Sequence, residues 1–476
     1  MLFHSLDYLY FLALVVGAYW ALLRRPGLRV ALLFAASCLF YMAWRPEYIV
    51  LIGGSTVLDF VAGRRIHEAT TARVRKAWLV ASLSGNLGLL FTFKYYNFFA
   101  LELSEGFAEL GVPVSLPFLE MALPVGISFY TFQTLSYTID IYRGTLAPTS
   151  SFFRFGAFVT YFPQLVAGPI VRASELLPQL DVRPRLDPAR VSRGLFLILV
   201  GLVKKVALAD YLAVNLADRV FDQPELFTAT EVVVALYAFT MQLYLDFSGY
   251  TDVARGSAML MGLELPENFD RPYQAASPAE FWRRWHMTLS RWLRDYLYFP
   301  LGGSRVGPVR AYLNLFLTMF LVGIWHGYWA NFEVFFWYAL LQAIAMTGHR
   351  AWHRWRQRPA EPRRRLGEVA LFVFLNMQFV VFSRILFRAT SMENAGAVWD
   401  RLFSGTSSMA QVSASVWIVL ALTFAAHFTP QRLYVAFETF FVRLPAPTQG
   451  LVLGAAGALL SMVAAAEAVP FIYFQF

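Results

Sequence analysis

The stretch LNLFLTMFLVGIWHGYWANF, residues 313–332, is long and apolar enough to cross a bilayer as a helix. Between Arg310 and Glu333, His326 is the only side chain that titrates near neutral pH. An ionisable group in such a run is costly, and it usually faces the interior of a helical bundle or a wet cavity. The sequence therefore predicts a membrane helix here and makes His326 a candidate functional residue.

Apolar stretches of this kind recur along the whole chain. Of its 476 residues, 58% are hydrophobic and 15% are charged, and the mean hydropathy is +0.50. Such a composition is typical of an integral membrane protein. We expect an all-α polytopic protein with about eleven or twelve transmembrane helices in a single membrane domain, 1–476. The expected spans are 8–23, 28–44, 47–62, 77–100, 124–142, 191–213, 229–250, 311–331, 332–348, 367–389, 413–429 and 449–470.

The distribution of basic residues predicts an orientation. Arg and Lys gather in 24–29 and 63–76, whereas 1–7 and 101–123 contain neither. The positive-inside bias then places the N-terminus outside the cytoplasmic membrane and 349–366, which holds seven arginines, inside. Because the net charge of +9 is spread over loops, we expect membrane lipid as a partner and no nucleic acid.

No metal site is expected. The single cysteine, Cys38, excludes a thiolate cluster within one chain. His349 and His353 have the i, i+4 spacing of metal ligands, but HRAWH lacks the Glu of a zinc-protease helix and lies among arginines. We likewise expect no bound cofactor.

Two apolar segments are poorly suited to straight spans. In 151–180, Pro163 and Pro169 interrupt a regular helix, which favours a re-entrant or surface course over a kinked span. In 276–304, Ser277, with Pro278 after it and Glu280 three residues on, predicts a helix start. At helical spacing the aromatic and arginine side chains of this helix fall on different faces, as in an interfacial helix at the cytoplasmic side.

The arginine face has two interpretations. It anchors the helix at the membrane surface, or it binds the phosphates of an anionic ligand. The candidate ligand-binding residues are Arg283, Arg284, Trp285, Arg291 and Arg294. His286 is similarly ambiguous, and a structural or snorkelling role at the helix surface is favoured over a catalytic one.

His326 has a more specific setting. Gly323 and Gly327 remove side chains on both sides of it, so another backbone or a substrate can approach closely, and Trp325 can line a passage. Counted from Arg310, His326 lies roughly 22–24 Å along the helix. A neutral imidazole in an apolar cavity suits a general base, and the alternative is a histidine that bridges two helices.

Asp246, Ser248 and Asp252 in LYLDFSGYTD invite comparison with a hydrolase nucleophile. No G-x-S-x-G elbow surrounds the serine, so polar helix packing is the favoured interpretation.

Several long motifs together resemble the membrane-bound O-acyltransferase family. They are FWRRWHMTLSRWLRDYLYFPLGG at 281–303, GIWHG at 323–327, PVGISFYTFQTLSYTIDIYRG at 124–144, YFPQLVAGPIVR at 161–172 and LYLDFSGYTDVARG at 243–256. The resemblance covers about 1–390. Within the family, the motifs are most similar to those of the bacterial branch that modifies cell-surface polysaccharides. The tail, 391–476, is less distinctive.

The resemblance implies a helical bundle around a funnel or tunnel, with His326 at its centre and His286 in a secondary role. It implies a cytosolic thioester donor, acetyl-CoA or an acyl carrier, as cosubstrate. It also implies an extracytoplasmic transferase as partner, so that the polysaccharide accepts the acyl group directly or through that partner.

The resulting hypothesis is O-acetylation of an alginate-like or cellulose-like exopolysaccharide at the inner membrane, with His326 as general base. The alternatives are transfer of D-alanine or another acyl group from a carrier, a proton-coupled transporter in which His326 carries the proton, and a structural subunit that recruits a periplasmic partner.

Overall fold

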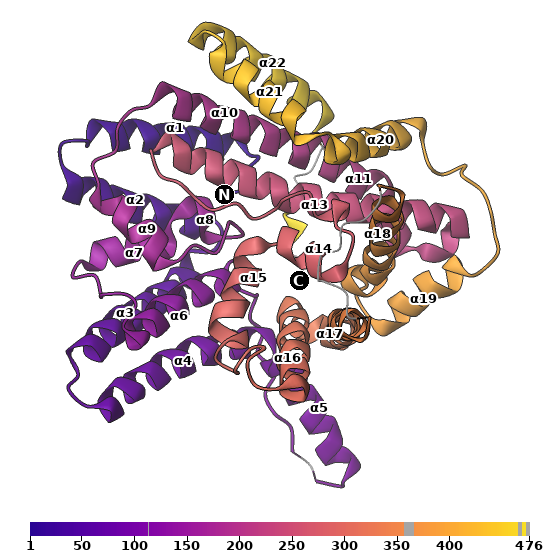
Figure 1. Ribbon diagram of the computed structural model, residues 1–476, viewed down its shortest axis with the longest axis horizontal. Helices are drawn as coiled ribbons and strands as arrows, with labels where there is room; N and C mark the ends of the chain where they lie inside the picture. Colours follow the sequence, from indigo (N-terminus) through magenta and orange to yellow (C-terminus); the bar gives the residue numbers. More distant parts are fainter. Residues whose placement is uncertain (113, 357–365, 465–468, 473–476) are drawn as a thin grey trace. The chain divides into compact units, whose positions relative to one another are not determined.

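A computed structural model describes the chain except for residues 113, 357–365, 465–468 and 473–476. In the part described, all regular elements are helical and no strand is found (Figure 1), which confirms the all-α class. The chain divides into two compact units. Unit 1 comprises Met1–Leu202, Gly249–Pro266 and Glu438–Gly454, and unit 2 comprises Val203–Ser248, Glu267–Phe437 and Ala455–Phe476. A single membrane domain over 1–476 stays a prediction.

Unit 1 contains the N-terminal helices. These are α1 Leu6–Ala21, α2 Pro26–Met42, η1 Pro46–Tyr48, α3 Ile49–Glu68, α4 Ala72–Lys94, α5 Tyr96–Glu109, α6 Ile127–Arg143, α7 Phe152–Thr160, α8 Phe162–Leu165, α9 Ala173–Asp181 and α10 Pro188–Leu202. Three helices contribute residues to both units, namely α13 Ala229–Leu260, α21 Gln431–Arg443 and α22 Ala446–Val463.

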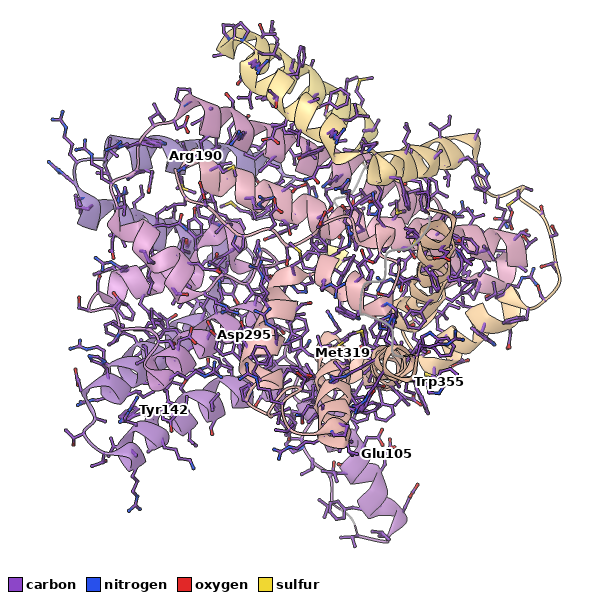
Figure 2. The ribbon with its side chains drawn as sticks, viewed as in Figure 1. Glu105, Tyr142, Arg190, Asp295, Met319 and Trp355 are labelled. Carbon is purple, nitrogen blue, oxygen red and sulfur yellow. The ribbon has the colours of Figure 1, made fainter. Side chains whose placement is uncertain are left out.

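Unit 2 contains the helices of the central and C-terminal sequence. These are η2 Val203–Ala209, α11 Asp210–Leu212, η3 Ala213–Ala217, α12 Asp218–Asp222, η4 Pro224–Leu226, η5 Pro272–Gln274, α14 Pro278–Arg284, α15 Met287–Leu293, η6 Arg294–Tyr298, α16 Pro308–His326, η7 Trp329–Asn331, α17 Phe332–Trp355, α18 Leu366–Arg388, α19 Met392–Leu402 and α20 Ala414–Phe428. Figure 2 shows the side chains along α16, where Met319 is labelled, and α17, where Trp355 is labelled.

Each expected apolar stretch overlaps a helix, but the expected number of spans is not reached. Among the described residues, four helices, α13, α16, α18 and α22, are long and apolar enough to cross a membrane. The pair α20 and α21, bent by 96°, makes a fifth if it is one span. α1 and α2 are apolar but have only 16 and 17 residues. The count of eleven or twelve is therefore not confirmed, whereas the polytopic class is.

The core of unit 1 includes a buried carboxylate shared by α3, α4 and α6. Asp59 on α3 is fully buried and accepts a hydrogen bond from Ser82. Asn86 Nδ2 donates to Asp59 Oδ2 at 2.8 Å, and Thr138 Oγ1 donates to Asp59 Oδ1 at 3.0 Å. Polar groups on three helices thus satisfy one another inside the bundle.

The segment 151–180 is broken, as its prolines predict. It forms the three short helices α7, α8 and α9, and every residue from 155 to 171 is buried. Irregular backbone inside a membrane protein is tolerated where protein surrounds it, and that condition is met here.

One basic residue of the predicted loops is not at the surface. Arg29 falls on α2, is 1% exposed, and donates to the carbonyl oxygens of Leu180 and Val182 at 3.4 and 2.8 Å. Arg29 lies in the expected span 28–44, and the helix begins slightly earlier, at Pro26, so this basic residue belongs to the helix rather than to a surface loop. Four of the seven arginines expected in 349–366, namely Arg358, Arg363, Arg364 and Arg365, lie outside the described residues.

In unit 2, a buried ionic cluster lies where α10 passes into π-helical turns. Lys205 Nζ is 2.8 Å from Asp210 Oδ1 and 2.9 Å from Asp246 Oδ1. Asp246 Oδ2 also accepts the backbone N–H of Ile472 at 2.7 Å, and Phe471 packs on Phe247 with ring centroids 5.6 Å apart. Phe471 and Ile472 are therefore held in the core of unit 2.

Candidate active site

His326 is the last residue of α16. The helix begins at Pro308 and ends where Gly327 takes an extended conformation, so the expected span 311–331 stops at His326. Its buried side chains recur every three or four residues, whereas Leu313, Leu317 and Leu321 are exposed on the other side. His326 is 5% exposed, and at 1.5 Å per residue it lies about 27 Å from the helix start.

The two glycines near His326, Gly323 and Gly327, allow the neighbouring helix to pack closely because they have no side chains. α16 and α17 pack side by side (Figure 1). A Cβ atom added at Gly323 would lie 2.4 Å from Cα of Ala339, and one at Gly327 would lie 2.8 Å from Cβ of Phe335. Of the two possibilities that the sequence leaves open, the structure therefore shows close approach of another helix.

Aromatic rings surround the imidazole of His326. The ring of Trp325 lies 4.8 Å from it, and that of Phe387 on α18 lies 5.8 Å from it, measured between centroids. Phe387 in turn contacts Phe335 and Tyr338 of α17 at 5.3 and 5.2 Å. A base held among such rings keeps one orientation and little contact with water.

Arg384 belongs to the same cluster, although it is not among the site residues predicted from the sequence. Its side chain is 2% exposed, and its guanidinium carbon lies 5.1 Å from the Phe387 ring and 5.3 Å from the Trp285 ring. Arg384 Nη1 is 3.5 Å from the hydroxyl of Tyr338. The signal for this residue is a charge inside the apolar stretch 367–389.

The helix start predicted at Ser277 is observed. Ser277 Oγ accepts the backbone N–H of Glu280 at 3.2 Å, and Glu280 Oε2 accepts that of Ala276 at 2.9 Å. The aromatic residues of the predicted face, together with Leu289, are buried. They are Trp282, Trp285, Leu289, Trp292 and Tyr296.

The single helix expected over 276–304 is wrong. It breaks at His286, whose φ of 43° is left-handed, into α14 and α15. At the break, the backbone of another segment replaces the helical hydrogen bonds. Asp270 N donates to Arg284 O at 2.9 Å, and Met287 N donates to Asn268 O at 2.9 Å.

His286 is a core residue rather than a snorkelling one. It is fully buried, and its ring lies 4.9 Å from that of Phe247. Desolvation lowers the pKa of His286 to about 3, so the imidazole is neutral at physiological pH. Ring contacts run from Phe247 to Trp285 at 6.5 Å, so His286 adjoins the cluster that holds Arg384.

The predicted donor-binding arginines differ in their availability. Arg283 is exposed. Arg284 already donates to Glu280 Oε1 at 3.0 and 2.8 Å, and Arg294 donates to Asp295 at 2.7 and 3.2 Å. Arg291 Nη2 donates to the backbone of Glu267 at 3.3 Å. Exposure therefore favours Arg283 and Arg294 over the half-buried Arg284 and Arg291 as contacts of a dissolved phosphate.

Asp246 serves the ionic cluster with Lys205, which fits the packing interpretation of LYLDFSGYTD. His427, another buried histidine, accepts the backbone N–H of Tyr273 at 3.2 Å and is thereby explained structurally.

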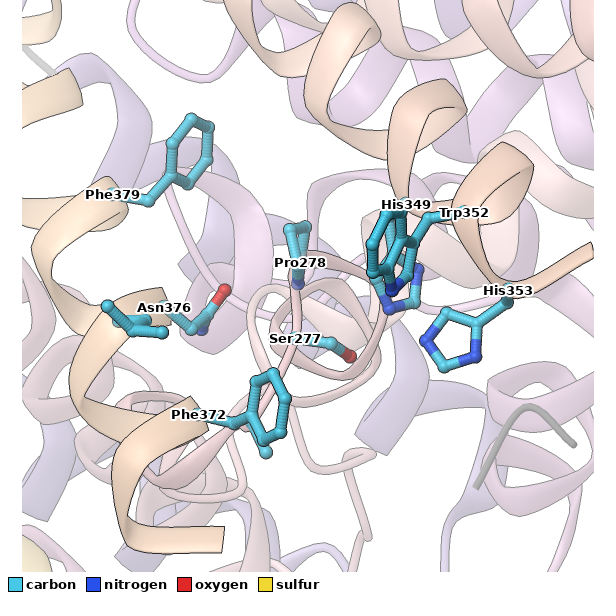
Figure 3. A pocket seen from close by; sticks show the side chains of 10 residues that line it. Ser277, Pro278, His349, Trp352, His353, Phe372, Asn376 and Phe379 are labelled. Atoms are coloured by element: carbon cyan, nitrogen blue, oxygen red, sulfur yellow. The ribbon is translucent and has the colours of Figure 1, made fainter. Parts of the chain in front are cut away.

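A cavity of about 260 Å³ lies beside the start of α14 (Figure 3). His349, Trp352 and His353 of α17 line one side, and Phe372, Leu375, Asn376 and Phe379 of α18 line another. The rings of His349 and His353 are 4.4 Å apart, but no set of three metal-ligating side chains occurs in the described part of the chain. The absence of a metal stays a prediction.

Comparison with known proteins identifies a family. The model of the membrane-bound O-acyltransferase family matches residues 145–392, which include His286, His326 and Arg384. The probable alginate O-acetylase AlgI of Pseudomonas aeruginosa is 39% identical over 87% of this chain and 77% of its own length. The peptidoglycan O-acetyltransferase of Helicobacter pylori is 36% identical over 76% of this chain and 71% of its own.

A more distant relative transfers a different acyl group. The teichoic acid D-alanyltransferase of Bacillus subtilis is 26% identical over 55% of this chain and 68% of its own length. The matches are acyltransferases, and none of them supports the transporter interpretation of His326.

Proposed function

We propose that this chain, which belongs to the membrane-bound O-acyltransferase family and is an O-acyltransferase, transfers acetyl groups from a thioester donor to hydroxyls of a cell-surface polysaccharide. The observation that carries the proposal is the buried His326 at the end of an apolar helix, inside the region that the family model matches. Relatives that acetylate alginate and peptidoglycan favour a polysaccharide acceptor.

In the proposed reaction His326 is the general base. It takes the proton of the acceptor hydroxyl while the hydroxyl oxygen bonds to the thioester carbonyl carbon. The C–S bond then breaks, the electron pair stays on sulfur, and the thiolate takes up a proton. The rings of Trp325 and Phe387 hold the imidazole in place during these steps.

The remaining assignments complete the scheme. The donor is a cytosolic acyl thioester, acetyl-CoA or a carrier, which meets Arg283 first. Arg284, Arg291 and Trp285 belong to the same donor-binding surface as Arg283. Trp325 lines the path to His326. His286 has a supporting role and stabilises the fold of the site. The protein lies in the inner membrane with its N-terminus outside, and an extracytoplasmic transferase passes the acetyl group to the polymer.

The test uses the full-length protein in lipid nanodiscs with labelled acetyl-CoA and an alginate oligosaccharide, with and without extracytoplasmic extract. Replacing a general base lowers the rate by about 10²–10⁴-fold, so His326→Ala should show a loss in this range. His67→Ala, an exposed histidine of α3, is the matched control and should keep full activity. Normal transfer by His326→Ala overturns the proposed role of the base.

The same assay separates the acetyl and D-alanyl alternatives. Labelled D-alanyl carrier protein replaces acetyl-CoA, and the preferred donor is the one with the higher kcat/KM. A preference for the D-alanyl donor rejects acetylation. Loss of acetyl groups from secreted polymer in cells that lack this protein identifies the acceptor.

A further inference from the structure

Arg384 is a buried cation whose charge no carboxylate balances within the described part of the chain. It lies on α18, one of the helices apolar enough to cross a membrane, and is 2% exposed. Its described neighbours are two aromatic rings and the hydroxyls of Tyr338 and Tyr273. Its Nε is buried without a hydrogen-bond partner. A desolvated cation in this state favours an anionic or partially negative ligand.

Three other cations with little or no exposure have partners that offset their charge. Lys205 contacts two aspartates, and Arg388, one helical turn beyond Arg384, donates to Asp218 at 3.0 Å. Arg29 has no carboxylate, but it donates to carbonyl oxygens at the C-terminal end of α9, where the helix dipole is negative. Arg384 alone among these four combines burial with only neutral hydroxyls and rings.

The position of Arg384 connects it to His326. The Phe387 ring lies 5.1 Å from the guanidinium carbon of Arg384 and 5.8 Å from the imidazole of His326. One ring therefore contacts both groups, and the unpartnered Nε lies in the same aromatic cluster as the base. A negative charge that develops beside His326 during a reaction would lie within the field of this arginine.

We propose that Arg384 stabilises the oxygen that becomes negatively charged when the thioester is attacked. His326 removes the proton of the acceptor hydroxyl, the new C–O bond forms, and the electron pair of the carbonyl bond moves to its oxygen. Arg384 stabilises that oxyanion until the pair returns, the C–S bond breaks, and the thiolate leaves and is protonated. The inference rests on the proposed function because it assigns a role in the same acyl transfer.

Preorganised positive charge at an oxyanion acts mainly on the transition state, so Arg384 should change kcat more than donor binding. Removing one oxyanion donor lowers kcat by about 10²–10³-fold, and we expect Arg384→Met to lose activity in this range with donor KM changed less than about threefold. Arg384→Lys keeps the charge but not the planar geometry, and it should recover part of the lost rate.

The experiment measures release of thiol from acetyl-CoA by the full-length protein in nanodiscs, with a small alcohol as acceptor. Arg388→Met is the matched control, because it removes a half-buried arginine of the same helix that Asp218 already balances. It should lose stability and keep kcat. If Arg384→Met does not fold, Arg384→Gln takes its place, since glutamine can also bond the tyrosine hydroxyl but carries no charge.

Three outcomes overturn the inference. They are a folded Arg384→Met with normal kcat, a loss that lies entirely in KM, and equal rates for Arg384→Lys and Arg384→Gln. Thiol release does not require a polysaccharide, so this assay tests the role of Arg384 independently of the proposed polysaccharide acceptor. Unacetylated polymer with normal thiol release rejects the proposed acceptor, whereas unchanged release by the arginine variants rejects the role of Arg384.

Discussion

Asp59 in unit 1 and Arg384 in unit 2 are both buried ionisable groups on helices, and their surroundings differ. Three side chains from two neighbouring helices, Ser82, Asn86 and Thr138, donate hydrogen bonds to the carboxylate of Asp59. The guanidinium of Arg384 meets rings and hydroxyls, and its Nε has no partner.

The difference distinguishes two uses of buried charge. A group whose hydrogen-bonding capacity is filled by its own protein fixes the arrangement of helices, and its removal should act on stability. A group whose capacity is left open is available to a ligand or a reacting atom, and its removal should act on rate. The following changes test this distinction, in order of decreasing effect.

Replacement of Asp59 should produce the largest change in stability. Asp59→Leu leaves buried donors of Ser82, Asn86 and Thr138 unsatisfied, and we expect the free energy of unfolding to fall by roughly 3 kcal/mol or more. Denaturant unfolding in detergent micelles measures it. Asp59→Asn keeps one acceptor oxygen and is the control with a smaller loss. A large fall in kcat of the folded fraction would place Asp59 with the reactive groups instead.

Gly323→Ala should come next, because its new Cβ would lie 2.4 Å from Cα of Ala339. Overpacking of this kind costs about 1–3 kcal/mol. Gly348→Ala on α17 meets nothing within 4 Å and is the control. It should stabilise the helix by about 0.5–1 kcal/mol, because alanine loses less backbone entropy than glycine. Thermal unfolding of the two variants should shift in opposite directions, and equal shifts would contradict the observed packing.

Acidification should act through His286. Its pKa is lowered to about 3 in the folded protein, from an ordinary value of 6.5, so below pH 6.5 the unfolded chain binds a proton that the folded one excludes. Stability should therefore decrease as pH falls, by about 2 kcal/mol between pH 7 and pH 5 from this group. His286→Asn tolerates the left-handed backbone and should remove this part of the slope. An unchanged slope in the variant would show that other groups cause it.

Arg283→Ala should have the smallest effect, on donor binding alone. A single exposed ion pair contributes up to about 1 kcal/mol, which corresponds to about a fivefold rise in donor Kd. Arg305→Ala, exposed in the loop before α16, is the control. Titration of acetyl-CoA at low and high salt measures the difference. A donor Kd unaffected by Arg283→Ala leaves this residue as part of a membrane anchor.

The positions of the helices could be predicted from the sequence, and so could the break in 151–180, because length, apolarity and proline act locally. The number of spans stays a prediction, since apolarity does not distinguish helices buried in protein from helices in lipid. In α6, for example, every residue from 127 to 138 is buried. Polar residues at 131, 133 and 134 on that helix add to the ambiguity.

Within the site, the start of α14 followed from local capping residues, but the break at His286 did not. It depends on backbone partners at Asn268 and Asp270, which periodicity does not reveal. The rule that selects His326, a charge or base in an apolar run, applies equally to Arg384. An arginine near the end of a predicted span is also typical of a side chain that reaches the membrane surface, and only its burial distinguishes the two.

The bond between Ile472 and Asp246 has a consequence for biosynthesis. The two residues are 226 positions apart, so Asp246 on α13 is translated long before Ile472, whose N–H group donates a hydrogen bond to it. When α13 is inserted during translation, Asp246 can already contact Lys205, which also contacts Asp210. The second carboxylate oxygen of Asp246 then still lacks the N–H donor of Ile472. Unit 2 thus completes this hydrogen bond only after Ile472 has been translated, and truncation before that residue would leave Asp246 without one of its partners in an otherwise inserted protein.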